Sequence, residues 1–225
     1  MMSGYDWDFS FLTPYIGALA RGVCVTIWIA CASFVVGTVI GTLASAFLPR
    51  TKFGNAMLLI NDAVRAVPIL VLLFMVYYFP WKMAFGIKPL GPIVASIVAF
   101  TIAQAAYTVD LAVGALRGLP TRAWETGASL GLSSTEIWRK VLAPSVIRLM
   151  LPAQMAFFIG IIRLTSITSV IGAPDVVFVA QTTGNQSYRA IEAWLVVGLI
   201  YILLVTPVTV LARRLDQSDW VKRRW

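Results

Sequence analysis

Several residue types on which most enzymes depend are missing or scarce in this sequence. Histidine is absent, there are only two cysteines, and charged residues make up 12% of the 225 residues. Soluble domains have about a quarter of their residues charged. The sequence contains no cluster of metal-ligating residues and no G-x-x-x-x-G-K-[ST] nucleotide-binding loop. We therefore expect no metal site, no cofactor and no ATP hydrolysis in this chain itself.

What the sequence has instead is hydrophobicity. Hydrophobic residues make up 59% of the chain and the mean hydropathy is +0.83, which is typical of an integral membrane protein. The length allows about five spans of 20 to 25 residues. We expect one all-α transmembrane domain over residues 1–225, without a soluble catalytic domain. Its expected spans are residues 22–48, 55–81, 92–116, 149–171 and 190–211.

Two pairs of residues in the first expected span bear on its packing. Cys24 and Cys31 are seven residues apart, so their backbones would be about 10 Å apart on a helix, which is too far for a disulfide. Gly37 and Gly41 are four residues apart, a spacing that allows a second helix to approach closely.

The basic residues predict the orientation of the chain. The net charge is +8, but Lys and Arg gather at the ends of apolar segments, so topology explains them better than nucleic-acid binding does. With the N-terminus outside, 4 of the 18 lie in outer segments and Arg65 and Arg163 lie in spans. The other 12 lie inside: Arg50, Lys52, Arg117, Arg122, Arg139, Lys140, Arg148, Arg213, Arg214, Lys222, Arg223 and Arg224. This excess predicts a cytoplasmic C-terminus and a cytoplasmic loop at residues 117–148.

The stretch from Glu125 to Pro144 within this loop has the pattern of two short helices. Thr121 suits the start of the first helix, and Gly131 should end it. Ser133 followed by Glu136 fits a capping box for the second. An apolar stripe follows at spacings of three and four: Ile137, Trp138, Val141 and Leu142. A short amphipathic helix pair between two spans is typical of a docking element.

The same stretch resembles the EAA loop in the membrane subunits of bacterial ABC importers. In that family the loop is the coupling helix that sits in a groove of the cytoplasmic ATPase subunit. Thr126 and Gly127 replace two alanines of the motif and Ala143 replaces a leucine. Gly127 should weaken the first helix by about 1 kcal/mol relative to alanine. The resemblance implies these coupling residues: Glu125, Gly127, Ala128, Gly131, Ile137, Trp138, Val141 and Pro144.

Further segments resemble permeases for polar amino acids, in the order expected for that family. They are residues 62–78, with Pro68 expected to kink the helix, and the stretches 105–110, 163–172 and 172–175. Polar and charged side chains in or near the expected spans are candidates for the substrate path: Arg65, Gln104, Tyr107, Asp110, Arg163, Thr165 and Ser166.

The individual roles of these residues stay open at the level of sequence. Asp62 and Arg65 are three residues apart, so a helix-packing ion pair is favoured over ligand contact. Asp110 suits a structural or gate-closing pair as well as substrate contact. Arg163 has the geometry to grip a carboxylate with two hydrogen bonds. It would equally pair with an acid on another span or on a partner subunit.

One departure from the family motif concerns the substrate site. Ala156, Phe157 and Phe158 stand where these permeases usually have Asn-Glu-Phe, and Leu164 stands where they have aspartate. If the lost polar groups bind substrate, this chain supplies only part of the site. A different, heterodimeric permease subunit would then supply the rest.

The resemblance implies an importer for a polar amino acid or a related small solute in the bacterial cytoplasmic membrane. The expected assembly has two membrane subunits, identical or paralogous, an ATPase dimer that carries ATP and Mg²⁺, and an extracytoplasmic solute-binding protein. The other partner is membrane lipid, and no nucleic acid is expected. Two alternatives remain: a self-sufficient secondary carrier or channel, and a non-transporting scaffold that recruits a cytoplasmic partner through the loop.

Overall fold

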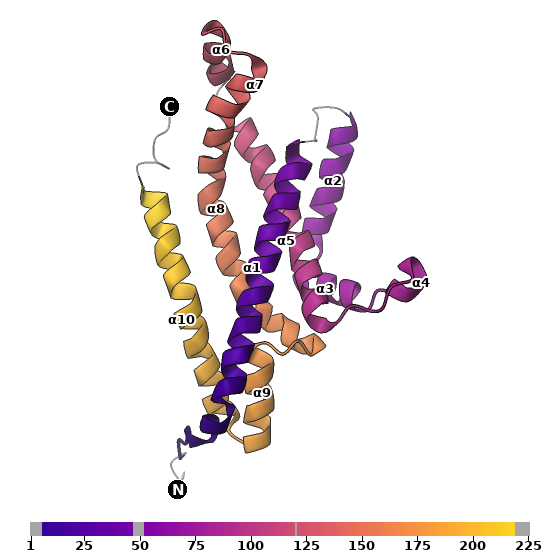
Figure 1. The fold of residues 1–225 in the computed structure, drawn as a ribbon, viewed down its shortest axis with the longest axis vertical. Helices are drawn as coiled ribbons and strands as arrows, with labels where there is room; N and C mark the ends of the chain where they lie inside the picture. Colours follow the sequence, from indigo (N-terminus) through magenta and orange to yellow (C-terminus); the bar gives the residue numbers. More distant parts are fainter. Residues whose placement is uncertain (1–5, 47–51, 120, 219–225) are drawn as a thin grey trace. The chain divides into compact units, whose positions relative to one another are not determined.

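A computed structural model describes residues 6–46, 52–119 and 121–218, and their regular structure is entirely helical (Figure 1). The expectation of an all-α membrane protein is confirmed. The helices are η1 (Ser10–Tyr15), α1 (Ile16–Ala46), α2 (Lys52–Ala66), α3 (Ile69–Tyr77), α4 (Trp81–Phe85), α5 (Pro92–Arg117), α6 (Thr121–Ser129), α7 (Ser134–Ile137), η2 (Trp138–Leu142), α8 (Ala143–Leu164), η3 (Thr165–Ile171), α9 (Val176–Ser187) and α10 (Ala190–Gln217).

Four helical stretches are long and apolar enough to cross a membrane: Ser10–Ser45, Pro92–Arg117, Ser134–Ile171 and Ala190–Gln217. A fifth span is obtained if α2 and α3 are counted together. The basic residues Arg50, Lys222, Arg223 and Arg224 lie outside the described residues, as do the side chains of Lys52 and Thr121.

The second expected span differs from a kinked helix. Helix α2 ends at Ala66, and α3 begins at Ile69 after a Pro68 with extended ψ of 137°. Proline has no N–H to continue the helix, and it disfavours helical geometry in the residue before it. The proline signal therefore produces a complete break. The connection expected after residue 81 also contains a short helix, α4.

The chain divides into two compact units. Unit 1 is the described part of Met1–Phe34, Pro68–Thr101 and Gly160–Pro207. Unit 2 is the described part of Val35–Val67, Ile102–Ile159 and Val208–Trp225. The long helices α1, α5, α8 and α10 each contribute residues to both units.

Unit 1 has its core where α1, α9 and α10 meet. A cluster of small and β-branched side chains fills it: Leu19, Val176, Val177, Ala180, Ala193 and Val197. A Cβ at Gly22 would lie 2.9 Å from the Cα of Val176, so only glycine allows α1 this close to α9. The buried Asp175 caps α9, and its carboxylate accepts a 2.8 Å hydrogen bond from the Phe178 N–H.

Unit 2 has its core between α5 and α8, where Ala112, Val146 and Met150 are buried. Helix α1 joins this unit at Gly41, where an added Cβ would lie 2.5 Å from the Ala105 carbonyl oxygen and 2.6 Å from the Thr108 Cβ. In a bilayer, helices associate largely through such close packing of small residues. Gly41 therefore provides the α1–α5 contact for which its sequence pattern is suited.

Replacing Gly41 with alanine should destabilise the fold, because two backbones would have to separate. We expect a loss of about 1–3 kcal/mol in unfolding free energy, measured by SDS-induced unfolding in mixed micelles. Gly17→Ala in the same helix is the matched control. A Cβ at Gly17 meets nothing within 4 Å, so that variant should be neutral or more stable by about 0.5–1 kcal/mol. Equal stability of the two variants would contradict the packing account.

Candidate functional site

The first helix of the loop, α6, ends in a Schellman motif. Gly131 has a φ of +74°, its N–H donates to the Ala128 carbonyl at 3.0 Å, and the Leu132 N–H donates to the Gly127 carbonyl at 3.2 Å. These bonds satisfy carbonyls that the helix end would otherwise leave free. An L-residue at a positive φ is strained. The predicted helix end at Gly131 is thus confirmed by a geometry that favours glycine.

Gly127 is the point at which α6 packs against the next helix. Ile137 is buried to 1% exposure, and an added Cβ at Gly127 would lie 2.8 Å from its Cγ1. The glycine that costs α6 some helix propensity therefore provides the space that Ile137 fills. The pair fixes the turn between α6 and α7.

The predicted capping box at the start of α7 is confirmed. The Ser133 hydroxyl accepts from the Glu136 N–H at 3.4 Å, and the Glu136 carboxylate accepts from the Ser133 N–H at 3.1 Å. Lys140 donates to the same carboxylate at 2.9 Å. The bonds from Lys140 and Ser133 lower the pKa of Glu136 to about 2. The carboxylate is therefore charged at neutral pH, and its contribution to the cap would be lost only as the pH falls from about 4.5 towards 2.

The expected boundary between loop and span, near residue 148, does not coincide with the end of a helix. Helix α7 continues through the π-helical turn η2 directly into α8, so the chain is helical from Ser134 to Leu164. Pro144 has no N–H for the Lys140 carbonyl, and the turn before it widens: the Ala143 N–H donates to Trp138, five residues back. The proline is absorbed by one wide turn and does not end the helix.

The loop exposes large apolar side chains. Leu130 is 73% exposed, Trp124 44% and Trp138 43%. Glu125 and Ala128 are exposed nearby on α6, and the described residues give the Glu125 carboxylate no hydrogen-bond partner. Ile137 and Leu142 of the predicted stripe are buried, whereas Val141 is half-buried. Ile137 thus packs inside the loop, whereas Trp138 of the same stripe is exposed and, with Trp124 and Leu130, supplies apolar surface.

Unit 2 contains a charged cluster where α2 faces α5. Arg65 lies 3.1 Å from the Asp110 carboxylate and 3.4 Å from that of Asp62. Its guanidinium also lies 4.9 Å from the ring centre of Tyr107. The predicted Asp62–Arg65 pair is present. The sequence predicted a structural or gate-closing pair for Asp110 without naming its partner, which is Arg65. Arg65 thereby joins two helices.

Phe157 packs against Tyr107, one of the three substrate-path candidates on α5. Its ring centre lies 3.6 Å from that of Tyr107. Here the family pattern has a glutamate, so an apolar side chain occupies the position of a charged one. With Arg65 also over the ring, Tyr107 is held between a cation and an aromatic side chain.

Gln104 belongs to a buried polar network rather than an open surface. Its side-chain amide donates to Gln154 at 2.7 Å and lies 3.0 Å from the Thr38 hydroxyl and 3.3 Å from that of Thr108. Gln154 donates in turn to Thr108 at 3.0 Å. The network links α1, α5 and α8 within unit 2. Gln154 and Thr38 did not stand out in the sequence, although a glutamine inside an apolar stretch is a usable signal.

The remaining candidates lie in unit 1, at the junction of α8 and η3. Arg163 is exposed, and none of the carboxylates in the described residues lies within ion-pair distance of it. Thr165 is buried; its hydroxyl donates to the Ile162 carbonyl at 2.7 Å and lies 3.3 Å from the Tyr201 hydroxyl. Ser166 donates to the Arg163 carbonyl at 2.8 Å. Among these three residues, Arg163 thus has a guanidinium without a carboxylate partner in the described residues. Tyr201, the neighbour of Thr165, was not predicted from the sequence.

Comparisons with known proteins identify the family to which the chain belongs. Residues 37–218 match a family described as "Binding-protein-dependent transport system inner membrane component". The chain is 31% identical over 216 residues to the glutamine transport system permease protein GlnP of Escherichia coli K12, covering 94% of this chain and 97% of that protein. It is 26% identical to the octopine transport system permease protein OccM of Rhizobium radiobacter, covering 97% and 92%.

Two solved structures share the fold. A chain of an amino acid ABC transporter crystallised with histidines superposes with a TM-score of 0.80 at 22% identity, covering 94% of this chain and 99% of that one. A chain of the MetNI methionine ABC transporter, in an inward-facing conformation, gives 0.70 at 23% identity, covering 90% and 96%. The chain therefore belongs to the binding-protein-dependent transport system inner membrane components, as a multi-pass permease subunit of an ABC transporter.

Proposed function

We propose that this chain lines the translocation path of an ATP-driven importer for a polar amino acid or a related small solute. Its relatives by sequence include permeases for glutamine and octopine. Both of these solutes carry a carboxylate and an amine nitrogen. In the proposed assembly a separate ATPase dimer binds ATP and Mg²⁺, and a solute-binding protein delivers the cargo. Family membership favours this importer over a self-sufficient carrier or a scaffold.

The observation that carries the proposal is the construction of the loop. A Schellman motif, a capping box and the Gly127–Ile137 contact fix its two helices. Three large apolar side chains and Glu125 are nevertheless left exposed. A surface that is both rigid and apolar suits a protein partner. We assign Trp124, Glu125, Leu130 and Trp138 to the contact with the ATPase.

The unbroken helix from Ser134 to Leu164 suggests how the loop acts on the path. Its part in unit 2, residues 134–159, is ~39 Å long at 1.5 Å per residue, with the loop at one end and Phe157, which contacts Tyr107, near the other. A displacement of the loop by the ATPase would be carried along this part of the helix within unit 2. The orientation that this requires has the loop and the C-terminus in the cytoplasm and the N-terminus outside, as the basic residues predict.

Arg163 is the proposed contact for the substrate carboxylate. It is a cation on a candidate span without an acidic partner in the described chain, and its planar guanidinium accepts a carboxylate in two parallel hydrogen bonds. Leu164, the next residue in the chain, offers apolar surface where the family pattern has an aspartate. We propose that a second permease subunit with its own polar groups completes the site.

Replacing Gly131 with alanine should uncouple ATP hydrolysis from transport. The positive φ would cost an L-residue about 1–3 kcal/mol, so the loop would lose its fixed shape and docking should weaken by about tenfold or more. The measurement is substrate uptake per ATP hydrolysed in proteoliposomes that contain the complete transporter. Gly118→Ala is the matched control, because a Cβ there has only ordinary contacts at 3.5 Å. Unchanged coupling in Gly131→Ala, together with unchanged coupling in Glu125→Ala, would remove the docking assignment.

Replacing Arg163 with alanine should weaken substrate uptake while the ATPase stays bound. The loss of a charge-assisted bidentate contact, about 1.5–3 kcal/mol, predicts a rise of about 10- to 100-fold in the half-saturating substrate concentration. Arg163→Lys keeps the charge without the fork, so its effect should be intermediate. Uptake with normal substrate affinity in both variants would leave Arg163 with a structural role.

A further inference from the structure

The connection between α3 and α5, residues 78–91, has an unusual composition. It contains Lys82 and Lys88 and no acidic residue, and half of its residues are aromatic or otherwise large and apolar. It lies outside the candidate spans. Figure 1 shows α4 at the end of a loop that leads away from α3. We refer to this segment as the 78–91 connection.

The 78–91 connection is a built element with its own small core. The ring centres of Phe79 and Trp81 are 4.8 Å apart, and Phe85 lies 6.0 Å from Phe79 and 5.9 Å from Trp81. The Trp81 indole N–H donates to the Val76 carbonyl at 2.9 Å, which ties the cluster to the end of α3. Gly86, with a φ of +69°, ends α4 through a 3.0 Å bond to the Lys82 carbonyl.

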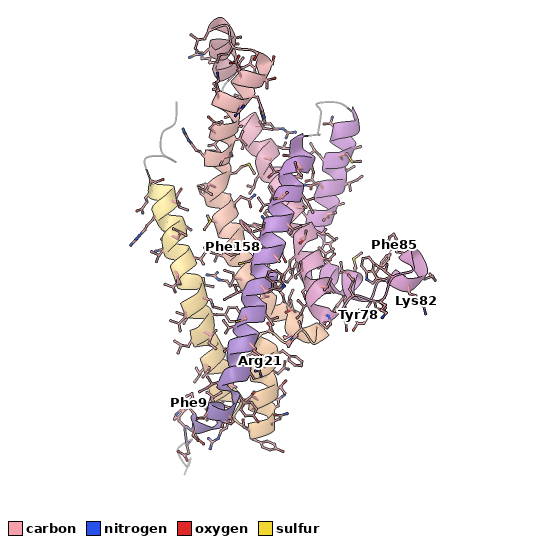
Figure 2. The ribbon with its side chains drawn as sticks, in the orientation of Figure 1. Phe9, Arg21, Tyr78, Lys82, Phe85 and Phe158 are labelled. Carbon is pink, nitrogen blue, oxygen red and sulfur yellow. The ribbon has the colours of Figure 1, made fainter. Side chains whose placement is uncertain are left out.

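This core still leaves large apolar side chains without cover in the described chain. Met83 is 87% exposed, Tyr78 72%, Phe85 66% and Ile87 46%. Figure 2 shows Tyr78, Lys82 and Phe85 together on this part of unit 1. Exposed apolar surface of this kind in water is uncommon unless something binds to it. The 78–91 connection combines large apolar residues with two lysines, a composition typical of segments that lie in a membrane interface.

The position of the 78–91 connection in the chain indicates that lipid covers its exposed apolar side chains. It begins at the end of the apolar helix α3 and ends at Pro92, where the candidate span α5 begins. The end at Pro92 is thus held close to a bilayer surface, and Ile87 and Lys88, five and four residues before it, can lie at most ~14–18 Å from it. Two lysines without a neighbouring acid complement negatively charged headgroups, and tyrosine and tryptophan favour the headgroup level.

We propose that the 78–91 connection is an interfacial anchor that binds anionic phospholipid headgroups. Met83, Phe85 and Ile87 enter the boundary between headgroups and acyl chains, and Lys82 and Lys88 contact the lipid phosphates. The anchor holds the start of α5 and the end of α3 at a fixed depth. It requires only that the chain crosses a bilayer, so a failed transport assay would not affect it.

The test measures the depth of position 83 in nanodiscs that contain the full chain with its co-purifying subunits. A spin label is attached at Met83→Cys after Cys24 and Cys31 are replaced with alanine. Its collisions with oxygen, which enriches in lipid, are compared with its collisions with a water-soluble nickel complex. Labels at Leu199→Cys, on a candidate span, and at Asp6→Cys, an exposed position before the first candidate span, provide the lipid and water references.

In phosphatidylcholine with phosphatidylglycerol, we expect the label at position 83 to resemble the lipid reference. In pure phosphatidylcholine the label should be less protected, because each lysine near an anionic surface strengthens binding to that surface by about fivefold. Replacing both lysines, Lys82→Gln with Lys88→Gln, should abolish this difference between the two bilayers. A label at position 83 that stays as accessible to nickel as the label at position 6 in both bilayers would overturn the anchor. Protection that appears only when a solute-binding protein is added would also overturn it and identify a protein-docking surface.

Discussion

The unbroken helix from Ser134 to Leu164 is the constraint on which the rest of the account depends. Pro144 should end an ordinary helix, but the π-helical turn before it gives the Ala143 N–H a partner five residues back. Because the turn is accommodated, the loop is a rigid extension of α8 and not a separate element. A loop fixed in this way has a mechanical route to Gln154 and Phe157, which lie on the same helix within unit 2.

Both units use the same device to bring helices together. Gly22 allows α1 to approach α9 in unit 1, and Gly41 allows it to approach α5 in unit 2. Polar contacts then specify the partner: Thr26 accepts from the Val176 N–H at 3.3 Å, and Thr38 lies 3.0 Å from the Gln104 amide. In lipid the hydrophobic effect does not favour one apolar helix face over another. Close approach of the backbones and hydrogen bonds of this kind therefore determine which helices associate.

Local signals in the sequence predicted the local structure well. The capping box at Ser133 and the helix end at Gly131 depend on neighbouring residues, so their patterns are complete in the sequence. Contacts between distant residues left no such pattern. Asp110 pairs with an arginine 45 positions earlier, and Gln154 meets a glutamine 50 positions earlier. The π turn before Pro144 left no such pattern either, because it depends on the longer helix in which the proline lies.

The central claim is that this permease acts through a separate ATPase bound at the loop. The most direct measurement is purification of the tagged chain from its native membrane in mild detergent, with ATP hydrolysis and mass analysis of whatever co-purifies. We expect an ATPase subunit and a second, different permease chain to co-purify. The ATPase subunit should no longer co-purify when the loop is altered at Trp124 and Leu130. Recovery of the chain alone, in a form that still transports after reconstitution, would contradict the central claim.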